Sequence, residues 1–142
     1  IFDVRNLSMP RLIFKEIIGT RGSSSVALNN HLAFTYFGPK NLLALPMTVC
    51  EGSNGGGSYG KDMTFSGLMV YDVTAGSGFS LRGKVAHKPG AGVTCSNWWT
   101  RANSQVKRSI IMDDYVYSVS GEQIKVNHRN NLSVDLASVK IN

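Results

Sequence analysis

The chain has 142 residues, of which 42% are hydrophobic, so it can bury a moderate core within at most one ordinary domain. Its 15 lysines and arginines exceed its 9 acidic residues, which gives a net charge of +6. The basic residues are scattered without a run or a stripe, and this pattern favours a mildly basic, solvated surface over a nucleic-acid site. The apolar runs are far shorter than the ~18 residues of a membrane span, so no spanning segment is predicted.

The N-terminal nineteen residues predict two short strands joined by a polar turn. Residues 1–4 read IFDV, residues 11–19 read RLIFKEIIG, and Asn6-Leu7-Ser8 lies between them. The whole chain has 15 glycines and only 17% charged residues, a composition that favours strands joined by turns.

The next segment predicts a tight hairpin that recurs near the C-terminus. SVALNNHLA at residues 25–33 aligns with SIIMDDYVY at residues 109–117, and in both copies two Asn or Asp residues separate the apolar stretches. Such a pattern is typical of two strands joined by a two-residue turn. The IFDV element also recurs, as VYDV at residues 70–73 and as IKVN at residues 124–127. Each copy is followed by a polar turn and a further predicted strand.

In chain order, these elements predict an all-β fold built from units of four antiparallel strands. Residues 1–19 are the back half of one unit, residues 24–87 are a full unit with a Gly-rich insertion at 48–65, and residues 108–141 are the terminal unit. A unit of this size is typical of a β-propeller blade, so the chain is predicted to hold about two and a half blades of a larger propeller. The predicted strands cover residues 1–4, 12–18, 24–29, 31–37, 41–46, 67–73, 79–86, 108–112, 115–120, 123–127 and 132–140.

Several of these stretches also resemble a known family. HLAFTYFGPKNLLALP, GLMVYDVTAGSGFSLRGKVAH and SIIMDDYVYSVSGEQIKVNHRNNLSVDLASVKI resemble the C-terminal part of the secreted bacterial β-propeller proteins that are distantly related to WD40 repeats. The resemblance covers most of the chain outside residues 48–65 and 88–104. It implies a propeller fold, a secreted, periplasmic or cell-surface location, and several further blades before Ile1. It implies no particular activity, because that family has no agreed catalytic motif.

The Gly-rich stretch CEGSNGGGSYGKD at residues 50–62 is the candidate for a phosphate-binding loop. It lacks the GxxxxGK[ST] spacing and no helix is predicted after it, so we interpret it as a long insertion between two strands. Long loops on a rigid scaffold often carry binding residues, and Tyr59 in this loop is therefore a candidate ligand-binding residue.

The connector before the last unit contains TCSNWWTR at residues 94–101. Trp98 and Trp99 could stack on a sugar or a base with Arg101 beside them, or one of the two rings could be a buried structural plug. The cysteines, Cys50 and Cys95, would be separate thiols in a reducing compartment and a disulfide in an exported protein. We predict the disulfide, which would tie the Gly-rich insertion to the connector.

No metal site, cofactor or catalytic set is predicted from the sequence. His31, His87 and His128 lie in no HxH or HExxH spacing, the cysteines form no CxxC pair, and Ser23, Ser24 and Ser25 lie in no GxSxG motif. Catalytic groups converge in space and not in sequence, so this pattern does not exclude an enzyme.

The first functional hypothesis is therefore a non-catalytic, exported β-propeller module that acts as a binding or interaction scaffold. The alternatives are an enzyme with its active site at the central channel of the propeller, and a glycan or nucleic-acid binder that uses the Trp98/Trp99 loop. A start at Ile1 would split a blade between its front and back strands, which predicts a processed piece of a longer precursor. Its predicted partners are the remaining N-terminal blades of that precursor, retained as a second chain, or further copies of this chain.

Overall fold

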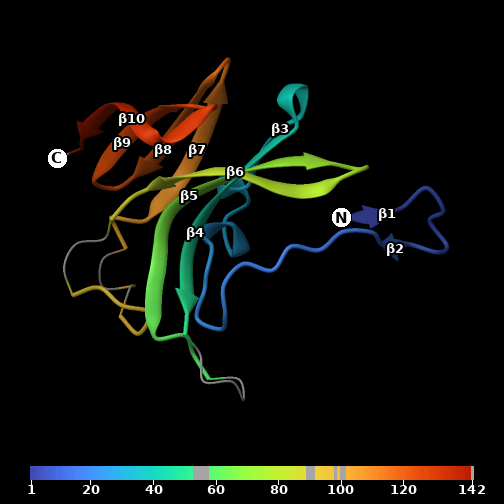
Figure 1. Ribbon diagram of the computed structural model, residues 1–142, viewed down its shortest axis with the longest axis horizontal. Helices are drawn as coiled ribbons and strands as arrows, with labels where there is room; N and C mark the ends of the chain where they lie inside the picture. The colour runs from blue at the N-terminus through green and yellow to red at the C-terminus, as the bar shows by residue number, and fades with distance from the viewer. Residues whose placement is uncertain (53–57, 89–91, 98, 100–101, 142) are drawn as a thin grey trace.

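The computed structural model describes residues 1–52, 58–88, 92–97, 99 and 102–141 (Figure 1). These residues form three antiparallel sheets and short 3₁₀ turns, so the predicted all-β class is confirmed. The N-terminal hairpin pairs β1 (Phe2–Asp3) with β2 (Arg11–Leu12). The first sheet has the order β3 (Thr35–Phe37), β4 (Leu42–Glu51), β5 (Asp62–Thr74) and β6 (Gly78–Ala86), and the second has the order β7 (Val106–Met112), β8 (Tyr115–Ser120), β9 (Gln123–His128) and β10 (Asn131–Lys140).

The second sheet follows the predicted strands closely because its turns are short and its side chains alternate between two faces. Asp113 begins the turn between β7 and β8 with a φ of 52°, a left-handed conformation that aspartate tolerates better than most residues. Ile111, Val116 and Asn127 lie opposite one another on β7, β8 and β9, and all three are buried. Alternate residues point to the opposite face of the sheet.

The inner strand of the first sheet differs from the prediction of strands at residues 24–29 and 31–37. Val26–Leu28 and His31–Ala33 form the 3₁₀ turns η1 and η2, and only Thr35–Phe37 pairs as a strand. The alignment of residues 25–33 with 109–117 is therefore wrong as a structural repeat.

Local side-chain hydrogen bonds explain this departure. The backbone N–H of Ala27 donates to Ser25 Oγ, and that of Leu32 donates to Asn30 Oδ1, each over 3.1 Å. Ser and Asn side chains that bond to nearby backbone in this way compete with sheet formation. The same residue types that suggested a hairpin turn thus cap two tight helical turns.

β4 and β5 continue well beyond the three-residue strand β3 as a two-stranded ribbon. They pair from Leu42 and Asp72 at one end to Glu51 and Asp62 at the other, so residues 48–51 and 62–65 belong to the paired strands and the predicted insertion at 48–65 is wrong in its bounds. Along the ribbon, Ser24 and Thr48 exchange two backbone hydrogen bonds of 2.9 Å.

Pro46 lies in the middle of β4, at the point where η1 and η2 interrupt the neighbouring strand. Proline has no N–H for a sheet ladder and is normally excluded from central strand positions. Here no strand runs beside its missing N–H, and its carbonyl accepts a hydrogen bond of 2.6 Å from Ser25 Oγ. The interruption of the inner strand therefore makes a buried proline compatible with β4.

The two four-stranded sheets stack face to face and enclose the main core. Its buried side chains come from both sheets: Leu42, Ala44, Leu68, Val70, Val85, Val106, Ile111, Val116 and Leu132. Gly83 on β6 lets β10 approach closely, because a Cβ at that position would lie 3.0 Å from Leu132 Cδ1. A side chain at position 83 would require Leu132 to shift by a few tenths of an ångström.

The N-terminal hairpin lies apart from this stack, as Figure 1 shows, and is joined to it by an extended segment. The hairpin is held by the Ile1 amino group, which donates to Phe14 O over 2.6 Å, and by Arg11 Nη2, which lies 3.3 Å from Asp3 Oδ2. The predicted strand at 12–18 is wrong in length, because β2 ends at Leu12 and no partner strand lies beside residues 13–18.

Candidate functional site

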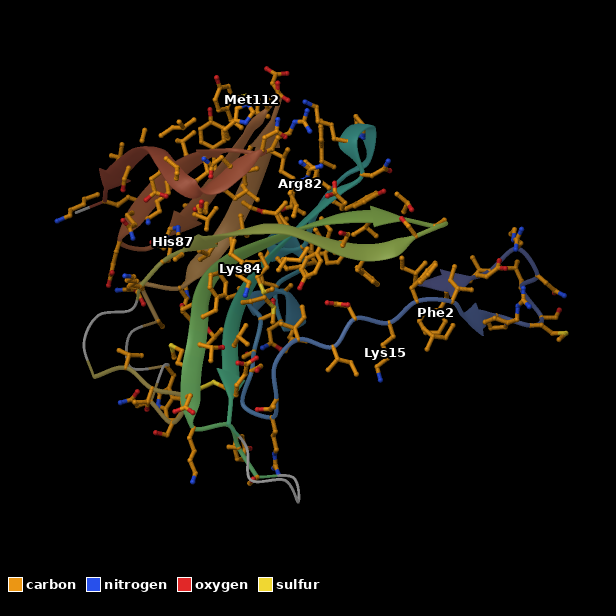
Figure 2. The ribbon with its side chains drawn as sticks, in the orientation of Figure 1. Phe2, Lys15, Arg82, Lys84, His87 and Met112 are labelled. Atoms are coloured by element: carbon orange, nitrogen blue, oxygen red, sulfur yellow. A yellow bond between two sulfur atoms is a disulfide. The ribbon has the colours of Figure 1, made fainter. Side chains whose placement is uncertain are left out.

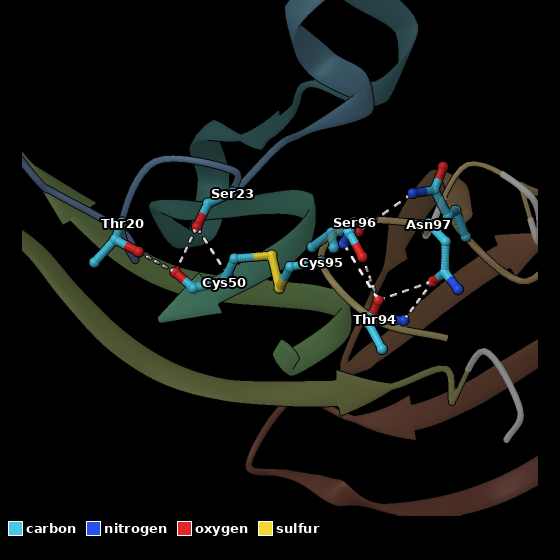
Figure 3. Close-up of a disulfide and its surroundings, with 9 residues drawn as sticks. Thr20, Ser23, Cys50, Thr94, Cys95, Ser96 and Asn97 are labelled. Carbon is cyan, nitrogen blue, oxygen red and sulfur yellow. Dashed lines mark hydrogen bonds between the residues drawn. A yellow bond between two sulfur atoms is a disulfide. The ribbon is translucent and has the colours of Figure 1, made fainter. Parts of the chain in front are cut away.

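The long loops of the first sheet are tied together at the end of the β4–β5 ribbon. Cys50 near the end of β4 is bonded to Cys95 in the connector between the sheets, with Cα atoms 5.9 Å apart, as Figure 3 shows. The predicted disulfide is therefore present in the structure. Both cysteines are buried. The bond links the ribbon to the connector between the two sheets.

The segment before η1 also clasps Cys50 through hydrogen bonds. The Thr20 hydroxyl donates to Cys50 O over 2.8 Å, Ser23 Oγ donates to the same carbonyl over 3.1 Å, and Cys50 N donates back to Ser23 Oγ over 2.9 Å (Figure 3). Three segments distant in sequence are thus fixed at one end of the first sheet. We call this region the loop end.

Tyr59, one of the predicted ligand-binding residues, lies at the loop end. The Arg21 guanidinium carbon lies 4.3 Å from the centre of the Tyr59 ring, a cation–π contact, and Gly60 N donates to Arg21 O over 2.8 Å. The Tyr59 side chain is nevertheless 61% exposed. The stacking anchors a ring that remains accessible from solvent.

The predicted tryptophan surface can be placed only in part. Trp99 is 58% exposed, whereas Trp98 and Arg101 lie outside the described residues. Neither Trp99 nor Tyr59 lines the cavity described next. The grouping of Trp98, Trp99, Arg101 and Tyr59 into one ligand site therefore stays a prediction.

A cavity of about 220 Å³ lies where η1 and η2 interrupt the inner strand, between β4 and the start of β7. Its lining is neutral: the side chains are hydroxyls, amides and apolar groups. They belong to Ser24, Ser25, Val26, Asn29, Asn30, Pro46, Met47, Thr48, Ser66, Gln105 and Val106, with Gly67 completing the wall. We call this cavity the polar cavity. The polar cavity is not predicted from the sequence, because it forms only where two 3₁₀ turns replace a predicted strand.

Some polar groups of the lining are hydrogen-bonded to other residues, and others have no hydrogen-bond partner among the described residues. Gln105 Nε2 donates to Thr48 Oγ1 over 3.3 Å, which leaves Gln105 Oε1 as an acceptor without a partner in the described part of the chain. Asn30 uses its Oδ1 to cap η2, and its Nδ2 has no bond to another described residue. The polar cavity thus presents at least one free acceptor and one free donor.

A buried polar network joins the two sheets at the end of β6, where Figure 2 labels His87. His87 is fully buried, its Nε2 lies 2.7 Å from Ser118 Oγ on β8, and its Nδ1 has no partner among the described residues. Burial, and then the nearby Lys125 ammonium, lower the pKa of His87 to about 4, although Asp135 acts in the opposite direction. The imidazole is therefore neutral at physiological pH.

Lys125 and Asn127 complete this network from β9. Lys125 Nζ donates to Ala86 O over 2.9 Å and forms an ion pair of 2.7 Å with Asp135. Asn127 Nδ2 donates to the carbonyls of Leu132 and Val134 and to Asp135 Oδ1, over 2.9 to 3.1 Å. Through the His87–Ser118 and Lys125–Ala86 contacts the network joins the two sheets, while His87 Nδ1 and Asn127 Oδ1 are buried without a partner among the described residues.

The described residues contain neither a cluster of metal ligands nor a membrane-spanning helix. Among the residues that the structure describes, no three His, Cys, Asp or Glu side chains come together as metal ligands. Nor do those residues include a helix with the length and apolarity needed to cross a bilayer.

Two stacked sheets, each a four-stranded antiparallel meander, define an all-β protein whose units have the form of propeller blades. The sequence model of the beta propeller domain family matches residues 1–132, and the chain therefore belongs to that family. Comparison with curated proteins and with solved structures gave no significant match.

Proposed function

We propose that the chain is a non-catalytic interaction module of an exported β-propeller, which packs against further blades and presents its loop end to a partner or ligand. The observation that supports it most directly is that each end of the two-sheet stack carries an apolar face that is at least partly open to solvent. In a propeller, such faces are buried against neighbouring blades around the central axis.

The outer face of the second sheet is the first of these surfaces. Its β7, β8 and β9 side chains lie on the face opposite the core, where Ile110 pairs with Tyr117 and Tyr117 with Val126, and Ile110 is 55% exposed. Val139, which lies opposite Ile124, is 62% exposed. A contiguous apolar sheet face of this kind marks an interaction surface in a soluble protein.

The outer face of the first sheet is the second surface. Leu43, Val49, Met69 and Tyr71 form a separate apolar cluster there. Between this face and the N-terminal hairpin lies a cleft of about 540 Å³, whose lining is almost wholly apolar and includes Phe2, Leu12, Phe14, Phe34, Leu45 and Phe79. The extended segment covers only part of the face, so an apolar cleft remains for another polypeptide.

The chemistry of the polar cavity favours binding over catalysis. None of the residues that line it carries a titratable side chain, so these residues supply neither a general acid nor a general base. His87 is the titratable group with a strongly lowered pKa near the sheet interface, but it is enclosed between the sheets. The enzyme alternative would need its catalytic groups from blades outside this chain.

The Cys50–Cys95 disulfide supports an exported location, because disulfides persist in oxidising compartments. The proposal accordingly includes secretion, with a periplasmic or cell-surface location. A distant relation to WD40 repeats is a separate part of it. The Trp98/Trp99 loop stays the basis of the glycan or nucleic-acid alternative, with Trp99 as its one described aromatic residue.

The favoured occupants of the two apolar faces are further blades of the same propeller, and copies of this chain are the second possibility. Light scattering after size-exclusion chromatography tests the role of the faces. We expect the chain alone to associate or to bind a hydrophobic dye strongly, and the variant Ile110→Lys to reduce both effects. Asn130→Lys, the same new charge at a polar turn, is the matched control. A folded species of 15.4 kDa that binds no dye would contradict the proposal.

A further inference from the structure

The residues that line the polar cavity determine which ligands it can bind. They disfavour three classes of ligand: anions, cations and purely apolar molecules. None of the described residues that line the cavity is Lys, Arg or His, so these residues would give a buried phosphate or carboxylate no counter-charge. None of them is Asp or Glu, so they would give a cation no partner either. A purely apolar ligand would leave the amides and hydroxyls of the wall without hydrogen bonds, which costs free energy.

Extension of the sheet by a bound peptide strand is also disfavoured. The backbone of Thr48 is already paired with Ser24 through two hydrogen bonds of 2.9 Å. Pro46 has no N–H, and its carbonyl already accepts from Ser25 Oγ. The β4 edge at the polar cavity therefore has no free backbone ladder for strand addition.

The remaining chemistry is that of a small, neutral ligand with several hydroxyl groups. Gln105 Oε1 can accept a hydrogen bond and Asn30 Nδ2 can donate one, and the hydroxyls of Ser24 and Ser66 can do either. Val106 and the neighbouring Pro46 and Met47 offer apolar surface for ring carbons. The volume of about 220 Å³ is below the range of about 300–1,000 Å³ typical of drug-sized ligands, so the cavity suits a single small unit.

We infer that the polar cavity binds one neutral saccharide unit, held by Gln105, Asn30 and the serine hydroxyls. This inference rests on the proposed non-catalytic binding role and adds the class of ligand. No aromatic ring lines the cavity to stack on the sugar, so binding to an isolated monosaccharide is weak, with a Kd in the millimolar range. Tighter binding would need a longer glycan that reaches beyond the cavity.

The test is an NMR titration of the ¹⁵N-labelled chain with glucose, galactose, mannose and N-acetylglucosamine at tens of millimolar. At least one of these sugars is expected to shift the backbone amides of Ser24, Thr48, Ser66 and Gln105 in a saturable way. Glucuronate and glucose 6-phosphate, which carry a negative charge, are expected to bind more weakly than the best neutral sugar.

Two variants test the assignment within the polar cavity. Gln105→Leu is expected to weaken binding about tenfold, the loss of about one good polar contact. Asn29→Ala, at an exposed position on the rim, is expected to weaken it severalfold and carries little risk to folding. Gln123→Leu makes the same change as the first variant at β9, away from the cavity, and is expected to leave binding unchanged.

The inference is overturned if none of the four neutral sugars shifts these amides, or if Gln105→Leu binds as well as the unmodified chain. Saturable shifts with an uncharged peptide such as acetyl-trialanine amide, and with no sugar, would also overturn the saccharide class. None of these outcomes bears on the two apolar faces, because light scattering tests the proposed interaction role separately.

Discussion

The first and second sheets have the same number of strands in the same antiparallel order, yet they differ in the lengths of their strands and connections. The second sheet keeps short turns, and its four strands pair in order from β7 to β10 with irregularities at Val106/Arg108 and between Asn131 and Ala137. The first sheet reduces its inner strand to three residues and extends β4 and β5 into a ribbon tied by a disulfide. One repeated architecture can thus provide a regular structural unit and a unit that carries loops and a cavity.

The comparison also concerns faces, since the main core lies where the two sheets meet. Leu68 is completely buried between them, whereas Leu136 on β10 is exposed. If this difference reflects the energetics, Leu68→Ala should lower the free energy of unfolding by about 2–5 kcal/mol, and Leu136→Ala by less than about 0.5 kcal/mol. Chemical denaturation of both variants measures the difference. Equal losses would mean that the stack is not the principal core.

The disulfide is specific to the first sheet, and its removal should affect that sheet first. Cys50 and Cys95 are 45 residues apart, and on the chain-entropy model a cross-link over such a loop stabilises the fold by about 3–4 kcal/mol. The Cys50→Ala/Cys95→Ala double variant should lose about this much unfolding free energy, measured without reductant.

Hydrogen exchange on the same double variant localises the effect. Faster exchange is expected at the end of the β4–β5 ribbon, with little change within β7–β10. The unmodified chain, after reduction and alkylation, provides a second form without the bond. Uniformly faster exchange in both sheets would contradict the separate behaviour of the loop end.

The His87 network joins the two sheets and should make their association sensitive to pH. The pKa of His87 is lowered from 6.5 to about 4, so between these two pH values the unfolded chain binds more protons than the folded chain. The contribution of neutral His87 to the free energy of unfolding is therefore complete above about pH 6.5. This contribution, on the order of 3 kcal/mol in total, is lost as the pH falls towards 4.

Denaturation at a series of pH values tests this expectation. The His87→Gln variant should be less stable at neutral pH but should lose less stability than the unmodified chain as the pH falls from 6.5 to 4. His128→Gln, at the end of β9, is the matched control. Parallel curves for His87→Gln and the unmodified chain would show that His87 does not carry the pH dependence.

The smallest expected effects concern the acidic residues that recur in the IFDV and VYDV elements. Asp72 pairs with Arg82 over 2.8 Å on the first sheet, and exposed ion pairs contribute about 0.2–1 kcal/mol. Asp3 pairs with Arg5 and Arg11 in the N-terminal hairpin, which lies apart from the stack. Asp72→Asn should therefore shift the thermal midpoint slightly, and Asp3→Asn should leave it unchanged. A larger shift for Asp3→Asn would mean that the hairpin is part of the cooperative core.

Much of the second sheet could be predicted from the sequence because its strands alternate and its turns are marked by polar residues. The first sheet was less predictable at its inner strand, where Ser25 and Asn30 look like residues of a hairpin turn but cap two 3₁₀ turns. The polar cavity could not be predicted at all, since its walls come from four segments that only the fold brings together. Tyr59 and Trp99 are exposed aromatic residues on loops, as the sequence predicted, and their membership of one ligand site stays a prediction.

The sequence by itself determined the all-β class and the membership of the propeller family, because alternation and repetition are properties of the chain alone. It left the cysteines as either separate thiols or a disulfide, and the structure shows the disulfide. Only the tertiary structure decided where the inner strand breaks, why Pro46 is tolerated within β4, and which side chains enclose the polar cavity. It also decided that His87 is neutral, because a pKa depends on burial and on charges brought from distant strands. These features arise from contacts between segments far apart in the chain, which no local pattern of residues can encode on its own.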